Sequence, residues 1–382
     1  MRWRFAIITL AFTATTWVAD RCKGVDGPAS TPKLGRETIP DDEKEDIAKL
    51  QALQKFLMEK DPTLKGHRGQ HPKQHGCVLA TFTVADGLSD ELKYGLFRKP
   101  ATYRAVIRYS NGESFDDTKP DVHGMAIKLV GVKGDKASDD ERETQDFVLA
   151  DSEVFFMKNV KNVLAFAQAR IKSAGPPPNP EAMAIFAKDH HDEAKLAEKA
   201  RSRVVGNPLR VQFWSTTPYQ LGSGAVKYTT RPRDPESSPA TPGTTPGYLR
   251  DAMVERLSKG KDPVVFDFLV QRQSDPDGEP IEDPTVEWKA PAVKVATITI
   301  EPQGFSASEQ LEFCENLSFN PWHALAEHRP LGGINRARKP IYVMSTDLRH
   351  AVRKTEGREP TSRAEPTTDD LDRFLRPAPP GH

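Results

Sequence analysis

The sequence predicts an α+β fold in which an antiparallel eight-stranded β-barrel is surrounded by peripheral helices. Eight segments alternate between apolar and polar residues or are rich in β-branched residues, as half-buried strands are. Helical patterns are clustered toward the middle and the end of the chain. The length of 382 residues would allow two or three average domains, but a barrel can occupy most of it as one domain.

The N-terminal part of the chain is expected to lie outside this domain. Residues 1–4 are basic, and residues 5–19 form an apolar run of signal-peptide length that is short for a transmembrane helix. We therefore predict that residues 1–19 are a signal peptide cleaved after Ala19, or else an uncleaved anchor. The protein is expected to be exported, either periplasmic or secreted, or held at the membrane by that anchor. Residues 20–41 are polar and rich in Pro and Gly, which is typical of a linker.

The elements of the domain follow from the spacing of apolar residues. Helices are predicted where the apolar period is close to 3.6, over residues 42–58, about 160–174 and about 180–203. Strands are predicted over about 77–85, 102–110, 123–131, 144–156, 210–215, 225–230, 264–271 and 293–300. A Pro-rich surface loop is predicted over residues 233–246. Residues 42–353 would thus form one domain, and the polar, Pro-rich residues 354–382 a disordered tail.

Charge and cysteine content exclude several classes of function. The chain has 54 Lys and Arg and 54 Asp and Glu residues, so no global positive field indicates a nucleic-acid partner. The three cysteines, Cys22, Cys77 and Cys314, form no disulfide framework and no Cys-x-x-Cys motif. Cys77 falls in a predicted strand, and we expect it to be a small buried apolar residue.

Tyr342 stands in a pattern that suits an iron ligand. Arg338 precedes it by four residues and Arg349 follows it by seven. A tyrosine binds ferric iron as a phenolate, although the pKa of a free tyrosine is near 10. A guanidinium beside the phenol oxygen favours the anion, and residues four apart share a face if this stretch is helical.

A second segment, far away in the sequence, supplies two histidines. His71 follows Arg68 by three residues, and His75 lies just before a predicted strand. Histidine is the side chain best suited to moving protons near neutral pH. A phenolate on one face of an iron porphyrin and a histidine on the other are the groups needed to split peroxides.

These segments and others between them resemble the catalase family in order and spacing, over roughly residues 45–350. The matching motifs are Arg68-x-x-His71, Arg108-Tyr109-Ser110, Asp121-Val-His-Gly124-Met-Ala126, the stretch from Gln145 to Phe156, and Arg338-x-x-x-Tyr342 with Arg349. The resemblance implies a catalase-like barrel that binds one haem b, with Tyr342 as the ligand of the iron.

The resemblance also implies roles for the other matched residues. His71 would be the catalytic residue that transfers the peroxide proton, and it is preferred to His75 because its offsets from Arg68 and Phe82 fit the family register. The cofactor-binding residues implied are Arg68, Arg108 and Arg349 at the haem propionates, Phe155 facing the haem, and Arg338 beside the phenolate. Asp151 would take the position of the distal Asn with which catalases orient peroxide.

The activity implied is that of a haem peroxidase or catalase-type oxidoreductase. It would reduce hydrogen peroxide or organic hydroperoxides through a ferryl stage, with an electron donor as partner, and would act in oxidative stress. A homo-oligomer is compatible with the resemblance.

The chain resembles the short, catalase-related branch, whose members favour peroxidase use of organic hydroperoxides. Because Asp151 replaces the distal Asn, we expect donor oxidation to outpace dioxygen release. The alternatives are a fatty-acid hydroperoxide isomerase or lyase, which needs a long apolar channel, and a non-catalytic haem-binding protein.

Overall fold

A computed structural model of the chain describes residues 34–140, 142–175, 177–236 and 240–354. The predicted signal segment, most of the predicted linker and the predicted tail lie outside the described residues. Within these ranges, no helix combines the length and the apolar character needed to cross a membrane. The strands are β1 (Gln74–Val84), β2 (Thr102–Asn111), β3 (His123–Val130), β4 (Thr144–Ala150), β5 (Phe213–Trp214), β6 (Tyr219–Leu221), β7 (Gly224–Pro232), β8 (Val264–Arg272) and β9 (Ala292–Ile300).

The strands form a closed antiparallel barrel, as predicted. Their order is β5-β4-β3-β2-β1-β9-β8-β7-β6, and a pairing between β5 and β7 closes the ring around eight strands. The additional strand β6 pairs with β7 alone among the strands. The predicted lengths of two strands are wrong. β4 ends at Ala150 instead of continuing to residue 156, and β5 has only two residues.

Aromatic side chains fill the interior of the barrel. Phe82, Phe147, Tyr228 and Phe268 are each at most 1 % exposed. The ring of Phe147 lies 4.8 Å from that of Phe268 and 5.0 Å from that of Tyr228. A barrel of this size is filled by its own side chains. The outer face of the sheet is therefore where a large ligand has room.

Seven α-helices surround the barrel in the described part of the chain. They are α1 (Glu43–Lys60), α2 (Val160–Ala174), α3 (Glu181–Asp189), α4 (His191–Arg201), α5 (Tyr248–Ser258), α6 (Ser308–Asn316) and α7 (Gly333–Arg353). The helix predicted over residues 180–203 is two helices, because the backbone leaves the helical region at His190, with φ −126° and ψ 50°. Short 3₁₀ turns occupy Pro62–Leu64, Asp90–Leu92, Gly95–Phe97, Pro208–Arg210 and Ala326–His328.

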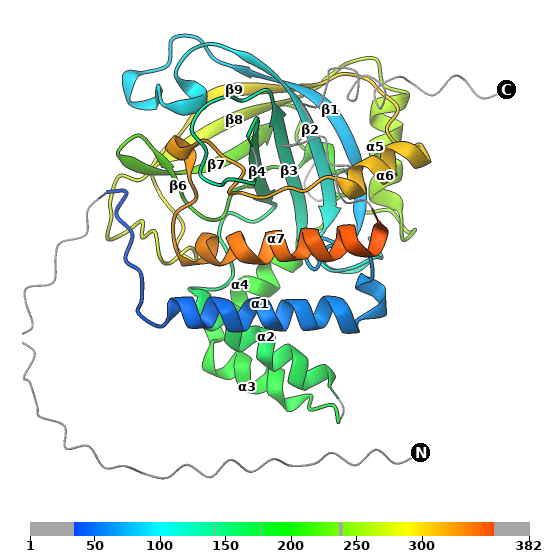
Figure 1. Cartoon of the computed structure of the whole chain (residues 1–382). Helices are drawn as coiled ribbons and strands as arrows, with labels where there is room; N and C mark the ends of the chain where they lie inside the picture. The colour runs from blue at the N-terminus through cyan, green and yellow to red at the C-terminus, as the bar shows by residue number, and fades with distance from the viewer. Residues whose placement is uncertain (1–33, 141, 176, 237–239, 355–382) are drawn as a thin grey trace, which may run out of the picture. The chain divides into compact units, whose positions relative to one another are not determined.

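The long helices α1 and α7 pack against each other beside the barrel. Figure 1 shows α7 lying between the strands and α1, with α2 and α3 beyond α1. Apolar side chains from three helices meet here, among them Leu50 on α1, Leu164 on α2 and Ala337 on α7. Arg336 forms ion pairs with α1 and with Glu37, which belongs to the predicted linker. These contacts fix the first turns of α7 and hence the face that it presents to the strands.

Cys77 and Cys314 form a disulfide, which the sequence did not predict. The expectation that Cys77 is only a small buried apolar residue is wrong. Packing of α6 against β1 brings the two Cα atoms to 5.4 Å although 237 residues separate them in the chain. That separation permits a disulfide, whose usual Cα spacing is about 4.4–6.8 Å.

Candidate functional site

A hollow lies between α7 and the outer face of strands β2 to β4. Its volume is about 690 Å³, open mouth included. Arg108 and Ser110 on β2, Gly124 and Ala126 on β3, and Val148 on β4 share this face because alternate strand residues point the same way. Five of the seven predicted site residues line the hollow: Arg68, His71, Arg108, Tyr342 and Arg349.

The strands hold His71 on several sides. Its backbone N–H donates to the Gly112 carbonyl at 2.8 Å, and its own carbonyl accepts from Arg108 at 2.8 Å. Its Nδ1 shares a hydrogen bond of 3.2 Å with Ser110 Oγ. The backbone of His71 has φ 54°, the left-handed region that non-glycine residues rarely adopt. The bonds to β2 therefore fix both the backbone and the ring orientation, so that Nε2 remains for a ligand in the hollow.

His75 is not part of the hollow's lining. It is fully buried, and its Nε2 shares a hydrogen bond of 2.9 Å with Asn111 Oδ1. Its carbonyl accepts from Arg250 Nε at 2.9 Å, which ties the start of β1 to α5. His75 thus supports the end of the barrel, while His71 faces the hollow.

Tyr342 faces the hollow from α7. It lies on one face of the helix with Ser345, Thr346 and Arg349, which all line the hollow. This stretch is helical, as the argument from spacing required, but Arg338 does not hydrogen bond to Tyr342 in the described structure. Its guanidinium instead donates to Thr217 Oγ1 and Asn335 Oδ1, both at 3.2 Å.

Three arginines meet at one end of the hollow. Arg68, Arg108 and Arg349 interact electrostatically with one another and with the buried carboxylate of Glu315. We call these four residues the arginine cluster. Arg68 Nη1 lies 3.0 Å from Glu315 Oε1. Within the cluster three guanidiniums thus lie near one carboxylate, an arrangement that favours the binding of an anionic ligand.

The charges of the cluster shift the pKa values of its buried members. Burial alone would raise the pKa of Glu315, but the positive charge of Arg68 and the contacts with His67 and Arg108 lower it to about 2. Burial, and then repulsion from Arg68 and Arg349, holds the pKa of Arg108 well below its usual range. Arg108 Nε has no hydrogen-bond partner among the described residues, although Arg108 is only 3 % exposed. A carboxylate in the hollow would satisfy that donor and reverse the repulsion.

The same environment keeps the imidazole of His71 neutral. Burial and the positive charges of Arg108 and Arg338 lower the pKa of His71 to about 3. A neutral imidazole can accept a proton, whereas an imidazolium cannot. Near neutral pH His71 is therefore in the protonation state that a general base requires.

Phe155 and Asp151 do not take the places expected of them in the hollow. Phe155 lies outside the lining, where its ring meets Phe156 at 4.8 Å and the Arg338 guanidinium at 5.8 Å. Asp151 lies outside it too, because both of its carboxylate oxygens are bound by His123, one by the backbone N–H and one by Nδ1, each at 2.8 Å. Ala150 is the residue that shares the hollow-facing side of β4 with Val148. The expectation that Asp151 faces the peroxide is therefore wrong, because Ala150 and not Asp151 lies on the hollow-facing side of β4.

Several residues of the site were missed from the sequence. Glu315 is one, since a single Glu in a short helix carries no signal of burial. Gly124 and Ser110 occur in the family motifs, but the sequence did not reveal that they contact His71. Gln54, Ser345 and Thr346 add polar groups to the lining. Of these, only the spacing of Ser345 and Thr346 from Tyr342 could have been used, because it places them on the same helix face.

The fold and the hollow together define a catalase-like barrel protein, and comparison with solved structures agrees. A bacterial catalase matches with TM-score 0.57 and 17 % identity, over 86 % of this chain and 67 % of that one. A fungal catalase matches with TM-score 0.58 and 16 % identity, over 87 % and 68 %. Catalase A from Saccharomyces cerevisiae matches with TM-score 0.51 and 17 % identity, over 87 % and 69 %. No protein-family model and no curated protein matches the sequence. The chain has a catalase-like fold.

The residues that line the hollow fit a haem. The arginine cluster places three guanidiniums at one end of the hollow, where they could bind the two propionates, and the buried Arg108 Nε has no hydrogen-bond partner among the described residues. Tyr342 offers an oxygen ligand, and Ala126, Val148, Phe319 and Ile341 offer apolar walls. The described residues contain no cluster of three or more His, Cys, Asp or Glu side chains that could hold a bare metal ion.

Proposed function

We propose that the protein is a haem-dependent oxidoreductase of the peroxidase and catalase type, which acts on hydrogen peroxide or organic hydroperoxides. The observation that carries this proposal is the placement of Tyr342 and His71 in one hollow, the first on α7 and the second against the strands, with the arginine cluster at one end. The catalase-like fold of the chain supports it.

In this proposal each group of residues has a separate task. Arg68, Arg108 and Arg349 would hold the propionates, because a guanidinium offers a rigid fork to a carboxylate. Tyr342 would hold the iron, and bound haem would supply the redox chemistry of the reaction. Arg338, one helical turn before Tyr342, would add positive charge on the same side of the cofactor.

His71 would take the proton from the peroxide oxygen and return it to the leaving oxygen. General acid–base catalysis of this kind contributes about 10²–10⁴-fold to a rate. Its low pKa keeps Nε2 free to accept the proton, and its bond with Ser110 keeps the ring in place. The leaving oxygen then departs as water or as an alcohol.

We further propose that peroxidase use outweighs dioxygen release. Because Asp151 is bound to His123 and Ala150 stands on the hollow-facing side, that side of β4 offers no amide to orient a second peroxide. An electron donor and a homo-oligomeric assembly belong to this proposal as well. The isomerase or lyase alternative would use the apolar walls of the hollow to hold a fatty-acid hydroperoxide.

Export also remains part of the proposal. The disulfide between Cys77 and Cys314 supports it, because stable disulfides are usual in oxidising compartments. The predicted signal segment lies outside the described residues. Fractionation of cells that express the full chain, followed by N-terminal sequencing of the recovered protein, tests whether residues 1–19 are removed.

A comparison of three peroxides tests the proposed activity. The haem-loaded protein would be assayed with hydrogen peroxide, cumene hydroperoxide and a fatty-acid hydroperoxide, each with and without an added electron donor. Donor-dependent consumption of peroxide is the expected result. Donor-independent rearrangement of the fatty-acid hydroperoxide would favour the isomerase or lyase instead, and no turnover of any of the three would contradict an enzymatic role.

A further inference from the structure

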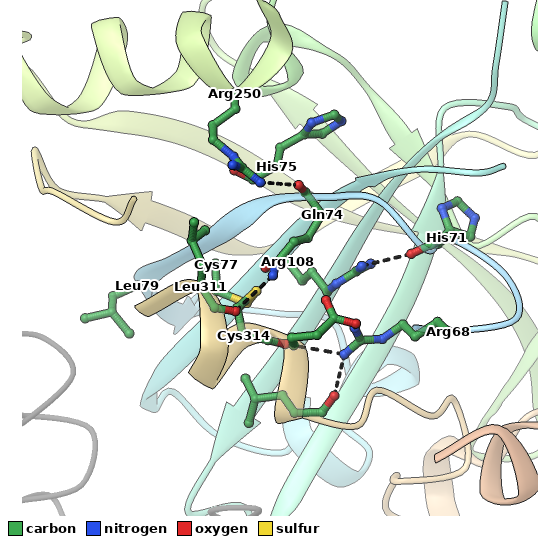
Figure 2. Close-up of a disulfide and its surroundings, with 12 residues drawn as sticks. Arg68, His71, Gln74, His75, Cys77, Leu79, Arg108, Arg250, Leu311 and Cys314 are labelled. Atoms are coloured by element: carbon green, nitrogen blue, oxygen red, sulfur yellow. Dashed lines mark hydrogen bonds and ion pairs between the residues drawn. A yellow bond between two sulfur atoms is a disulfide. The ribbon is translucent and has the colours of Figure 1, made fainter. Parts of the chain in front are cut away.

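The disulfide joins the two parts of the chain that hold the arginine cluster. Cys77 on β1 is the direct cross-strand partner of Arg108 on β2. Cys314, in the last turn of α6, immediately precedes Glu315. Figure 2 shows the sulfur–sulfur bond beside Arg108, with Arg68 on the far side of the Cys314 backbone. The disulfide therefore links the cross-strand neighbour of Arg108 to the residue just before Glu315.

The end of α6 supplies the acceptors that orient the other two arginines. Arg68 donates to the carbonyls of Cys314, at 3.4 Å, and of Leu317. Arg349 donates to the same Leu317 carbonyl at 3.1 Å. The last carbonyls of a helix lack intrahelical donors and carry a partial negative charge, so they attract guanidinium groups. The directions of Arg68 and Arg349 thus depend on where this helix end lies.

The remaining contacts of α6 with the barrel in the described structure are weaker than a covalent bond. Gln74 Nε2 donates to the Leu311 carbonyl at 2.9 Å, and Phe313 on α6 belongs to one apolar cluster with Leu79 on β1. Cys77 is half-buried and lines a second hollow of about 990 Å³, open side included, beside Phe305 and Phe313. A small dithiol can therefore approach the disulfide from this second hollow.

We propose that the Cys77–Cys314 disulfide positions the arginine cluster and so sets its affinity for a dicarboxylate ligand, the haem propionates. A dithiol supplies two electrons and two protons, the sulfur–sulfur bond breaks, and two thiols and an oxidised dithiol result. The end of α6 then moves away from β1, and Arg68 and Arg349 lose their fixed directions. This inference rests on the proposed function, since it concerns the same cofactor.

A haem titration with a matched ligand tests the proposal. Apoprotein would be compared in three forms: oxidised, reduced with dithiothreitol and blocked with iodoacetamide, and the double variant Cys77→Ala/Cys314→Ala. Each form would be titrated with haem and with haem dimethyl ester, which lacks the propionate charges. The variant Cys22→Ser, which keeps the disulfide, is the control. We expect the dissociation constant for haem to rise about tenfold or more without the disulfide, and that for the ester to change little.

The outcomes separate the possible failures. Equal haem affinity in all forms would overturn the proposal, and so would an equal loss for haem and ester, because the disulfide would then only stabilise the fold. If the oxidised protein bound no haem, the proposed function would fail. Modification of arginines by phenylglyoxal, mapped by mass spectrometry in the apoprotein, would still decide the positioning claim. Faster labelling of Arg68 and Arg349 without the disulfide is expected, and equal labelling would contradict it.

Discussion

Gly124 lies directly against the imidazole of His71. A β-carbon at position 124 would stand 2.7 Å from His71 Nδ1 and 2.9 Å from Ser110 Oγ, closer than such atoms approach in proteins. The close packing of β3 against this ring is possible only because residue 124 has no side chain. The position of His71 thus depends on β3 as well as on the loop that carries it.

The substitution Gly124→Ala should displace His71 while leaving the haem ligand untouched. A misplacement of about 1 Å can cost roughly 10²-fold in rate. We expect stoichiometric haem and a slower first cleavage of peroxide, measured by stopped-flow spectroscopy. The matched control is Gly304→Ala, at a glycine with nothing within 4 Å of the added carbon and no positive φ. An unchanged rate in Gly124→Ala would show that the fixed position of His71 is unimportant.

Removal of the imidazole itself should have a larger effect. His71→Ala should retain haem and lose about 10²–10⁴-fold in the rate of peroxide cleavage, the range for one general acid–base group. His75→Ala should lower the melting temperature, because it leaves Asn111 without its buried partner, and should leave the cleavage rate of the folded fraction nearly unchanged. The opposite pattern would make His75 the distal residue.

The pH dependence should reflect the low pKa of His71. Burial, with help from Arg108 and Arg338, places this pKa at about 3, below its usual value of 6.5. Bound propionates would offset the arginine charges but not the burial. A depressed pKa keeps the imidazole neutral as the pH falls through 6.5, so the cleavage rate should stay level there and decline only in more acidic solution. Single-turnover rates between pH 4 and 8 test this, and an acid limb centred near 6.5 would refute it.

The ratio of dioxygen release to donor oxidation should change when residue 150 is substituted, and should not change when residue 151 is substituted. Ala150→Asn places an amide on the hollow-facing side of β4, and we expect it to raise dioxygen release relative to donor oxidation. Asp151→Asn should leave that ratio unchanged but destabilise the fold by about 1–3 kcal/mol, because a buried hydrogen bond with His123 is weakened. Oxygen-electrode rates and thermal melts of the two variants decide the matter. A shift in the ratio with Asp151→Asn alone would restore the original assignment.

The sequence predicted the barrel well because its strands have a regular physical signature. Alternating and β-branched residues marked seven of the eight barrel strands almost completely, and the fold expectation is confirmed by the closed ring. Helices α5 and α6 were not predicted, since 11 and 9 residues give only two or three turns of apolar pattern. The end of β4 was placed too late. Asp151 was assigned from the family register, which did not reveal that His123 binds its carboxylate.

The site was predictable only where residue spacing fixes geometry. Tyr342 and Arg349 lie seven residues apart on one helix, so their common face follows from the helical period. Glu315 and the disulfide depend on how α6 packs on β1, which no local pattern encodes. With three cysteines, the sequence could not indicate whether any two would pair. Arg338 was expected beside the phenol oxygen, but Thr217 and Asn335 offered acceptors that only the folded chain brings near.

The most direct test of the central claim is the haem content of Tyr342→Phe. The wild-type protein should bind one haem b per chain with a high-spin ferric spectrum, measured by pyridine haemochromogen assay and absorbance. The variant loses the only proposed ligand and no packing volume, and should bind no stoichiometric haem while keeping its melting temperature as apoprotein within a few degrees. Tyr219→Phe, a buried tyrosine outside the hollow's lining, is the matched control and should retain haem. Stoichiometric haem with an unchanged spectrum in Tyr342→Phe would contradict the account.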